Sequence, residues 1–161
     1  MGKSLFGEIH MKIDYKKQGK KNRESGQRFE VRVRKDLEKD GWIVDRWSNN
    51  VSDYPESNIN LPLEERKDRK LVPAKSRFGM RTTGFPDFIA FRTRILSNIN
   101  SKEMPNILYE IIGVECKSNG SLDKTEKEKC KWLIKNKIFS KIIIVSKGKK
   151  RGKIVYKEFG S

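Results

Sequence analysis

The sequence is short of the side chains that bind soft metals or form disulfides. Its 161 residues include two cysteines, Cys116 and Cys130, and one histidine, His10. This supply is too small for a zinc site or for an iron–sulfur cluster held by cysteines. A metal bound by this chain would therefore have to be held by oxygen ligands.

Long hydrophobic runs are missing as well. No stretch approaches the roughly 18 apolar residues of a membrane-spanning helix, and residues 1–24 lack the apolar core of a secretory signal. We therefore expect a soluble, intracellular protein of the cytoplasm that has no membrane partner. In such a reducing compartment, Cys116 and Cys130 are expected to be free thiols.

Acidic residues are few beside the basic ones. The chain has 21 Asp and Glu against 37 Lys and Arg, which leaves a formal net charge of +16. A charge of this size suits a polyanionic partner, either the phosphate backbone of nucleic acid or an anionic membrane surface. Because the sequence offers no membrane segment, nucleic acid is the favoured partner.

A helix is predicted over residues 26–40. Phe29, Val33 and Leu37 recur every four residues, as on the buried stripe of an amphipathic helix, and a glycine ends the pattern. Residues 1–25 before it are polar and lysine-rich, and we interpret them as a basic N-terminal arm.

The rest of the chain predicts a sheet and one more helix. Five segments rich in apolar, aromatic or β-branched residues are predicted as strands: residues 42–47, 85–91, 108–117, 141–147 and 153–159. Residues 92–106 are predicted to be a turn-rich connector, residues 122–137 a helix, and residues 48–85 an insertion or loop near the active site. This order predicts a single α/β domain over residues 1–161, with a mixed central β-sheet flanked by helices.

Two carboxylates carry the chemical argument. Asp87 is expected in an apolar strand, directly after Pro86, where an isolated buried carboxylate is costly unless it is paired or bound to a metal. Glu115 ends the next apolar strand, and a hairpin is expected to make the two strands neighbours. Two carboxylates and a backbone carbonyl form a hard oxygen site for Mg²⁺ or Mn²⁺.

Lys117 and Glu30 are predicted to join this site. Side chains alternate along a strand, so Lys117 shares a face with Glu115, where it can orient a water molecule or offset phosphate charge. Glu30 lies on the flank of the buried helical stripe and can bring a further carboxylate. Singly, each has a simpler explanation, as a surface lysine or a solvated glutamate. Together, in so basic a chain, they favour phosphodiester cleavage.

The same residues carry a resemblance. Pro86-Asp87, followed by Glu115-Cys116-Lys117, resembles the motif of the PD-(D/E)XK nuclease superfamily. The resemblance implies a restriction-endonuclease-like core and hydrolysis of DNA by water that a divalent metal activates. It also implies that Asp87, Glu115 and the carbonyl of Cys116 ligate Mg²⁺ or Mn²⁺, and that Lys117 positions the attacking water.

Two branches of this superfamily share further residues with the chain. The stretch GQRFE at residues 26–30 is similar to the opening of archaeal Holliday junction resolvases, which implies that Glu30 supports the metal from its helix. Residues 113–133 are similar to the VRR-Nuc nucleases. Glu126 stands about where that group usually has a glutamine, so it is a weaker candidate for the site.

Three basic stretches are candidates for contact with phosphates: residues 16–23, 74–81 and 147–153. The second directly precedes the strand of Asp87 and is the preferred one. The individual residues predicted to bind nucleic acid are Lys75, Arg77, Arg81, Lys149, Lys150 and Arg151.

The expected function is that of a metal-dependent DNA endonuclease. We favour selectivity for junctions, flaps or branched DNA in replication, recombination or repair, as the resemblance to resolvases implies. Two alternatives stay open: a restriction-like endonuclease that reads sequence, and a basic nucleic-acid-binding protein without catalysis. A homodimer is expected, because cutting two strands at matched positions requires two sites related by a twofold axis.

Overall fold

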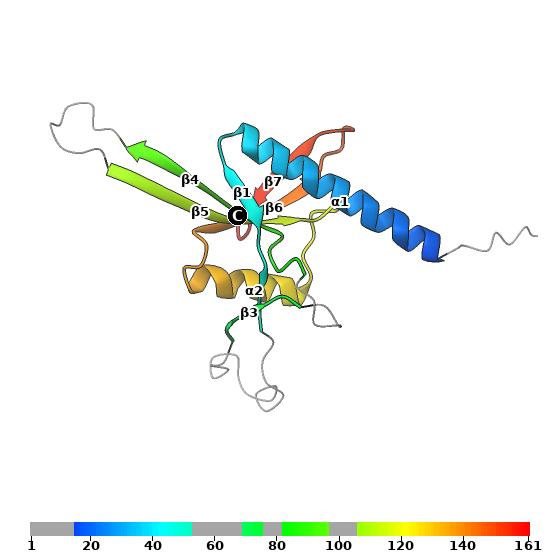
Figure 1. The fold of residues 1–161 in the computed structure, drawn as a ribbon, viewed down its shortest axis with the longest axis horizontal. Helices are drawn as coiled ribbons and strands as arrows, with labels where there is room; N and C mark the ends of the chain where they lie inside the picture. Colours follow the sequence, from blue (N-terminus) through cyan, green and yellow to red (C-terminus); the bar gives the residue numbers. More distant parts are fainter. Residues whose placement is uncertain (1–14, 53–68, 76–81, 97–105) are drawn as a thin grey trace, which may run out of the picture.

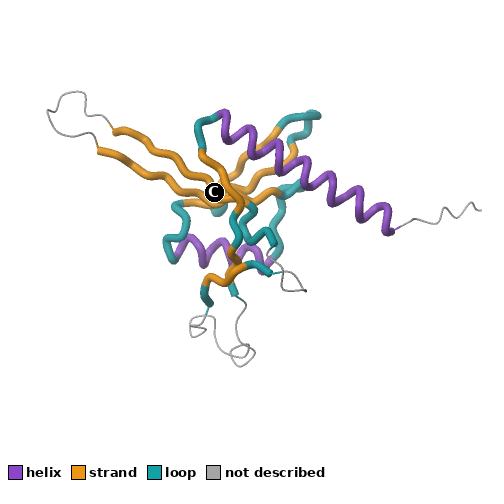
Figure 2. The backbone as a smooth tube through the Cα atoms, viewed as in Figure 1, coloured by secondary structure: helices purple, strands orange, loops and turns teal. Residues whose placement is uncertain are grey.

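The computed structural model describes residues 15–52, 69–75, 82–96 and 106–161. These residues form a mixed α/β fold in which helices lie on both faces of a sheet (Figures 1 and 2). In chain order the elements are helix α1 (Tyr15–Lys39), strands β1 (Ile43–Arg46), β2 (Asn49–Val51), β3 (Leu71–Pro73), β4 (Phe88–Leu96) and β5 (Asn106–Cys116), helix α2 (Lys124–Lys135), and strands β6 (Lys141–Lys147) and β7 (Ile154–Glu158).

The main sheet has five strands in the order β1-β4-β5-β6-β7. Strands β5 and β6 are parallel, because α2 carries the chain back between them, and the other neighbours are antiparallel. Strands β2 and β3 pair separately as a small two-stranded sheet. The predicted mixed sheet flanked by helices is thus confirmed.

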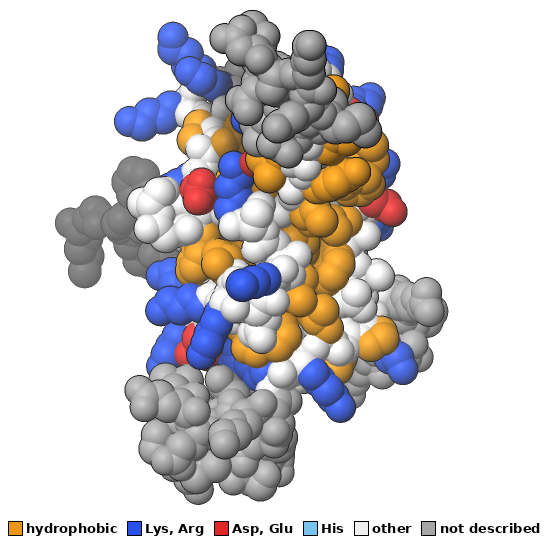
Figure 3. All heavy atoms as spheres, turned by 90° about the vertical axis from the view of Figure 1, so that its left-hand side faces the viewer, with side chains coloured by type: hydrophobic (Ala, Val, Ile, Leu, Met, Phe, Trp, Pro, Cys, Tyr) orange, Lys and Arg blue, Asp and Glu red, His pale blue; other side chains and the backbone are white. Residues whose placement is uncertain are grey.

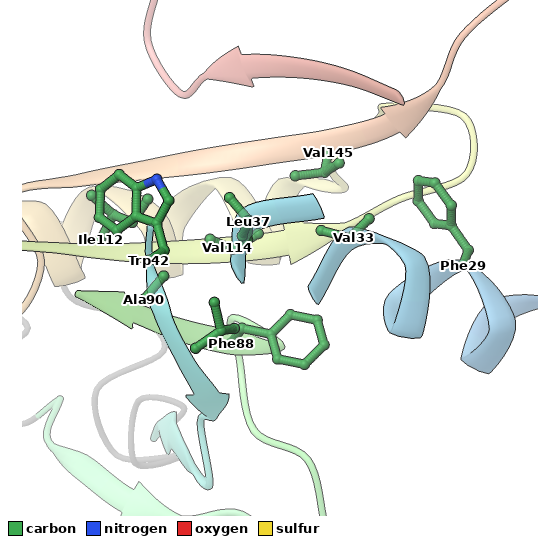
Figure 4. Packing of buried hydrophobic residues seen from close by; sticks show 10 residues of the cluster. Phe29, Val33, Leu37, Trp42, Phe88, Ala90, Ile112, Val114 and Val145 are labelled. Carbon is green, nitrogen blue, oxygen red and sulfur yellow. The ribbon is translucent and has the colours of Figure 1, made fainter. Parts of the chain in front are cut away.

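Helix α1 covers one face of the sheet. Its three buried residues are Phe29, Val33 and Leu37, the stripe that the sequence predicts. They pack against side chains of β1, β4, β5 and β6: Val44, Phe88, Ala90, Ile112, Val114 and Val145. Figure 4 shows this packing from close by. Alternation along each strand sends these residues to the α1 face and their neighbours to the other.

Helix α2 covers the opposite face (Figure 1). Cys130 and Leu133 of this helix pack with Phe139, Ile142 and Ile144 in a second buried cluster. The thiols of Cys116 and Cys130 are both free, as expected. The central strands therefore have buried faces on both sides, which accounts for their nearly continuous apolar sequences.

The first helix is longer than the prediction. It begins at Tyr15 instead of residue 26, so the described part of the predicted arm, residues 15–25, is helical. This segment buries no side chain, and a prediction that requires a buried stripe misses it. Lysine, glutamine and arginine are nevertheless good helix formers, so the helix continues through them. Residues 1–14 lie outside the described part of the chain.

The β4–β5 hairpin is longer as well. Strand β4 runs from Phe88 to Leu96, so residues 85–87, predicted as strand, precede it, and residues 92–96, predicted as connector, are strand paired with β5. Opposite charges explain the extension, because Arg92 and Glu110 lie opposite each other in the register and form an ion pair. The predicted insertion, residues 48–85, contains β2 and β3 among its described residues.

Candidate functional site

Asp87 and Glu115 meet although 28 residues separate them in the sequence. Strands β4 and β5 are antiparallel, with Phe88 opposite Val114. This register brings Asp87, the residue before Phe88, beside Glu115, the residue after Val114. The backbone N–H of Asp87 donates to Oε2 of Glu115 at 3.1 Å. In return, the backbone N–H of Cys116 donates to Oδ2 of Asp87 at 2.8 Å. The predicted convergence of the two carboxylates is confirmed.

The segment before β4 holds Asp87 in place. The N–H of Trp47 donates to the carbonyl oxygen of Asp87 at 3.1 Å, and the N–H of Gly84 donates to the carbonyl of Trp47 at 2.8 Å. A Cβ on Gly84 would lie 1.9 Å from the carbonyl oxygen of Asn49, so only glycine permits this close backbone contact. The peptide bond between Phe85 and Pro86 is cis.

Burial sets the electrostatics of the two carboxyl groups. Glu115 is 5% exposed, and burial together with the charge of Asp87 raises the pKa of Glu115 to about 8. Burial likewise raises the pKa of Asp87 to about 6, against the lowering effect of its hydrogen bond from the Cys116 N–H. The ionised form of each carboxyl group is thus less stable here than in water. A cation beside the two groups would stabilise their ionised forms.

Lys117 is the cation that the chain itself supplies. Its Nζ lies 3.2 Å from Oε1 of Glu115 and also forms an ion pair with Glu126. Burial lowers the pKa of Lys117, but the hydrogen bond to Glu126 and the charge of Glu115 outweigh that effect and leave the pKa raised. The predicted placement of Lys117 beside Glu115 is confirmed, and its amine remains an ammonium ion at neutral pH.

Glu126 has a larger part in this arrangement than the sequence analysis gave it. Its Oε2 accepts the backbone N–H of Asp123 at 2.9 Å, while the N–H of Glu126 donates to Oδ1 of Asp123 at 2.8 Å. This reciprocal capping box starts helix α2 and leaves Oε1 of Glu126 for Lys117. The pattern Asp-X-X-Glu before an amphipathic stretch is the signal that could have identified it.

Glu30 lies on α1 and is half-buried. Its negative charge is among the causes that raise the pKa of Asp87 and of the Cys116 thiol, so it is within electrostatic range of both. Across the described residues, no group of three or more His, Cys, Asp and Glu side chains is gathered closely enough to hold a metal ion. The ligands that the described chain brings together are therefore the paired carboxylates of Asp87 and Glu115.

This donor set fits a hard divalent cation. Carboxylate oxygens suit Mg²⁺ and Mn²⁺, whereas a soft metal would require thiolates. The nearest sulfur belongs to Cys116, and burial raises the pKa of this thiol, which keeps it protonated. Lys117 is a single positive charge among the carboxylates of Asp87, Glu115 and Glu126. The site thus has three carboxyl groups beside one ammonium ion, and a divalent cation would favour the ionised forms of these carboxyl groups.

The residues predicted to bind nucleic acid are only partly within the described chain. Lys75 is exposed, as are three residues of the turn between β6 and β7: Lys149, Lys150 and Arg151. This turn lies against α1, where Nη2 of Arg32 donates to the carbonyl oxygen of Gly152 at 2.8 Å. Arg77 and Arg81 fall outside the described residues.

The sequence matches no family model, no curated protein and no solved structure. Within the described ranges, no helix combines the length and the apolar character needed to cross a membrane.

Proposed function

We propose that this protein is a metal-dependent DNA endonuclease with a restriction-endonuclease-like core, selective for junctions, flaps or other branched DNA. One observation carries the proposal: Asp87 and Glu115, distant in sequence, share hydrogen bonds at the ends of paired strands, with Lys117 beside them. A buried acidic pair next to an ammonium ion is costly for stability alone, and such clusters mark functional sites.

The proposed metal site consists of Asp87, Glu115 and the backbone carbonyl of Cys116, with Glu30 in support. A bound Mg²⁺ or Mn²⁺ would lower the pKa of a water molecule and neutralise charge on the attacked phosphate. The resemblance to PD-(D/E)XK nucleases and the oxygen donors of the two carboxylates both support this assignment.

Lys117 has a definable task in the proposed reaction. Since Glu115 and Glu126 keep it protonated, it cannot take a proton from water and acts as a hydrogen-bond donor and a positive charge. Glu126 anchors the amine from the start of α2, so the lysine is held at the end of β5. It can orient the attacking water or contact a phosphate oxygen, which is electrostatic stabilisation from a fixed position.

The proposed selectivity for branched DNA concerns the exposed basic residues of the β6–β7 turn. This turn contacts α1, the helix that also carries Glu30. Such residues contact phosphates without regard to base sequence. The similarity of residues 26–30 to Holliday junction resolvases favours the same substrate class.

Cleavage of labelled DNA tests the proposal. Four-way junction, flap and linear duplex are each incubated with the protein in Mg²⁺, in Mn²⁺ and in EDTA. We expect cleavage of the branched substrates only with metal, and complete loss of cleavage in Asp87→Ala and Glu115→Ala with DNA binding largely retained. Asp45→Ala is the matched control, because Asp45 is an exposed carboxylate on β1 whose hydrogen bond is to its own neighbour.

The same assay separates the alternatives. Undiminished cleavage by both Asp87→Ala and Glu115→Ala would refute the assignment of the site. Binding of all three substrates without cleavage in either metal would favour a non-catalytic nucleic-acid-binding protein, which the net charge of +16 also supports. Cleavage of linear duplex at one position would favour a sequence-reading endonuclease.

A further inference from the structure

The outer half of the β4–β5 hairpin projects beyond the rest of the sheet (Figure 1). Strand β1 pairs with residues 88–91 of β4, and β6 pairs with residues 112–116 of β5. Among the described residues, the strand segments farther out, 92–96 and 106–110, therefore pair only with each other. This two-stranded segment also extends past α2, which packs on β2 and β6 (Figure 1).

The face on the α1 side is polar and internally satisfied. Glu110 lies at its centre, with Oε1 at 2.8 Å from Nζ of Lys141 and Oε2 at 2.9 Å from Nη2 of Arg92. Arg94 is 3.4 Å from the same carboxylate. The guanidinium of Arg92 also stacks over Trp42, 4.0 Å from the ring centroid.

The face on the α2 side has the opposite character. Three cross-strand pairs line it, together with Ile43 of β1, and none of these residues is charged: Phe91 with Ile111, Thr93 with Tyr109, and Ile95 with Ile107. We call these seven residues the apolar hairpin face. Its six hydrophobic side chains are between 38% and 71% exposed. Figure 3, which views this end of the molecule, shows hydrophobic side chains gathered on it.

We propose that the apolar hairpin face binds the same face of a second copy of this chain, forming a twofold homodimer. At about 200 Å² for a fully exposed side chain of this size, the six hydrophobic residues expose roughly 600 Å² per copy. Patches on monomers rarely exceed this area. Two such faces bury roughly 1,200 Å², which is above the ~1,000 Å² of a specific interface.

Charge and symmetry favour a second copy over another partner. Each copy carries a net charge of +16, so two copies repel each other over their basic surfaces, and an uncharged face is where they can approach. An acidic partner would instead be drawn to the lysines and arginines. The face can also pack on itself, because a twofold axis that crosses the strands between the two copies, over their Thr93–Tyr109 pairs, places the outer pair of one copy opposite the inner pair of the other.

Occupation of this face leaves the candidate site open. Phe91, the innermost residue of this face on β4, is four residues from Asp87, which is roughly 13 Å at ~3.3 Å per residue. The outermost, Ile95, is roughly 26 Å from Asp87 on the same count. The dimer inference does not rest on the proposed function, and a dimer without nuclease activity would satisfy it.

Neighbouring residues on β5 provide the test and its control. Tyr109 belongs to the apolar hairpin face, while Leu108 is 47% exposed on the opposite face. Sedimentation velocity of the full chain in high salt is expected to give a wild-type mass twice the monomer's 18.8 kDa. Tyr109→Lys and Ile95→Lys should each weaken the dimer by roughly 30-fold or more. Leu108→Lys should sediment like the wild type.

Circular dichroism of each variant confirms that the fold is retained, as expected for substitutions at exposed positions. A wild-type protein that sediments at 18.8 kDa at every attainable concentration would overturn the inference. So would equal dimerisation of Tyr109→Lys and Leu108→Lys, whether both are dimeric or both are monomeric.

Discussion

At the scale of single residues, Asp87 and Glu115 show a conflict between stability and the proposed function. Their carboxyl groups are close and largely buried, and burial is the main cause that raises both pKa values. Lys117 offsets one negative charge, but it is shared with Glu126. Such a buried pair of carboxyl groups lowers the free energy of unfolding when no ligand is bound, and this cost is expected at a site that binds a cation.

Asp87→Asn should therefore stabilise the protein when no divalent metal is present. Asparagine can still accept the N–H of Cys116, while it removes a charge that burial and the nearby charge of Glu30 disfavour. We expect the free energy of unfolding in EDTA to rise by about 1–2 kcal/mol, measured by urea unfolding at neutral pH. Asp45→Asn on the exposed edge strand is the control and should change little. A loss of stability in Asp87→Asn would contradict this account.

At the scale of elements, ion pairs extend the β4–β5 hairpin. Glu110 on β5 pairs with Arg92 on β4 and with Lys141 on β6, so one carboxylate links three strands. The hydrogen bond from Lys141 holds the pKa of Glu110 below its ordinary value of 4.5, and Arg92 adds to the effect. The polar face of the hairpin is thus stabilised by the ionised form of Glu110.

The lowered pKa of Glu110 determines in which direction the stability of the protein changes with pH. The contribution of Glu110 is fully present above pH 4.5, the ordinary pKa, and is lost as the pH falls through the lowered pKa of the folded state. Glu110→Gln should cost about 1–3 kcal/mol near neutral pH, and wild type and variant should converge in acid. Urea unfolding across this pH range provides the measurement.

Glu38 offers the matched control for the ion pair. It pairs with Arg34 one turn away on α1, and both side chains are well exposed. Glu38→Gln should therefore cost less than about 0.5 kcal/mol at any pH. Equal costs for Glu38→Gln and Glu110→Gln would mean that the hairpin network contributes no more than a surface pair.

At the scale of the whole molecule, positive charge is concentrated where the fold leaves it exposed. The outer half of α1, residues 15–25, buries no side chain, and the basic β6–β7 turn lies against the same helix. Nζ of Lys147 approaches Oγ of Ser25 at 3.4 Å, which ties the end of β6 to this helix. The exposed basic residues of α1 and those of the β6–β7 turn thus lie on one helix and on the turn that contacts it.

Lys20 and Lys21 test whether this surface binds DNA. Both are exposed on the outer half of α1, and glutamine keeps the helix propensity while it removes the charge. The double variant Lys20→Gln, Lys21→Gln should bind DNA more weakly. Its slope of log affinity against log salt should fall by about 0.9 for each phosphate that the variant no longer neutralises. Fluorescence anisotropy at several salt concentrations measures both effects.

Lys35 and Lys39, exposed near the other end of α1, are the control pair. Lys35→Gln, Lys39→Gln removes the same charge and should leave the salt slope close to that of the wild type. Equal slopes for the two double variants would mean that only net charge matters and that the outer half of α1 makes no specific contact.

Local patterns predicted much of this fold. The stripe of Phe29, Val33 and Leu37 predicted the buried face of α1, and the strands β1, β6 and β7 lie within the segments expected for them. The prediction is wrong for segments whose structure does not follow from their own hydrophobic pattern. Residues 15–25 form helix without a buried stripe, and residues 92–96 form strand because β5 and its charges pair with them.

The sequence alone determined which residue types were available: oxygen ligands without a soft-metal set, a surplus of positive charge, and carboxylates at Asp87 and Glu115 beside apolar segments. Only the tertiary structure decided which of them meet. Strand register brought Asp87 to Glu115, and the cap of α2 brought Glu126 to Lys117. The reason is physical, because periodicity reports the face on which a residue lies, whereas a site depends on the pairing of distant segments.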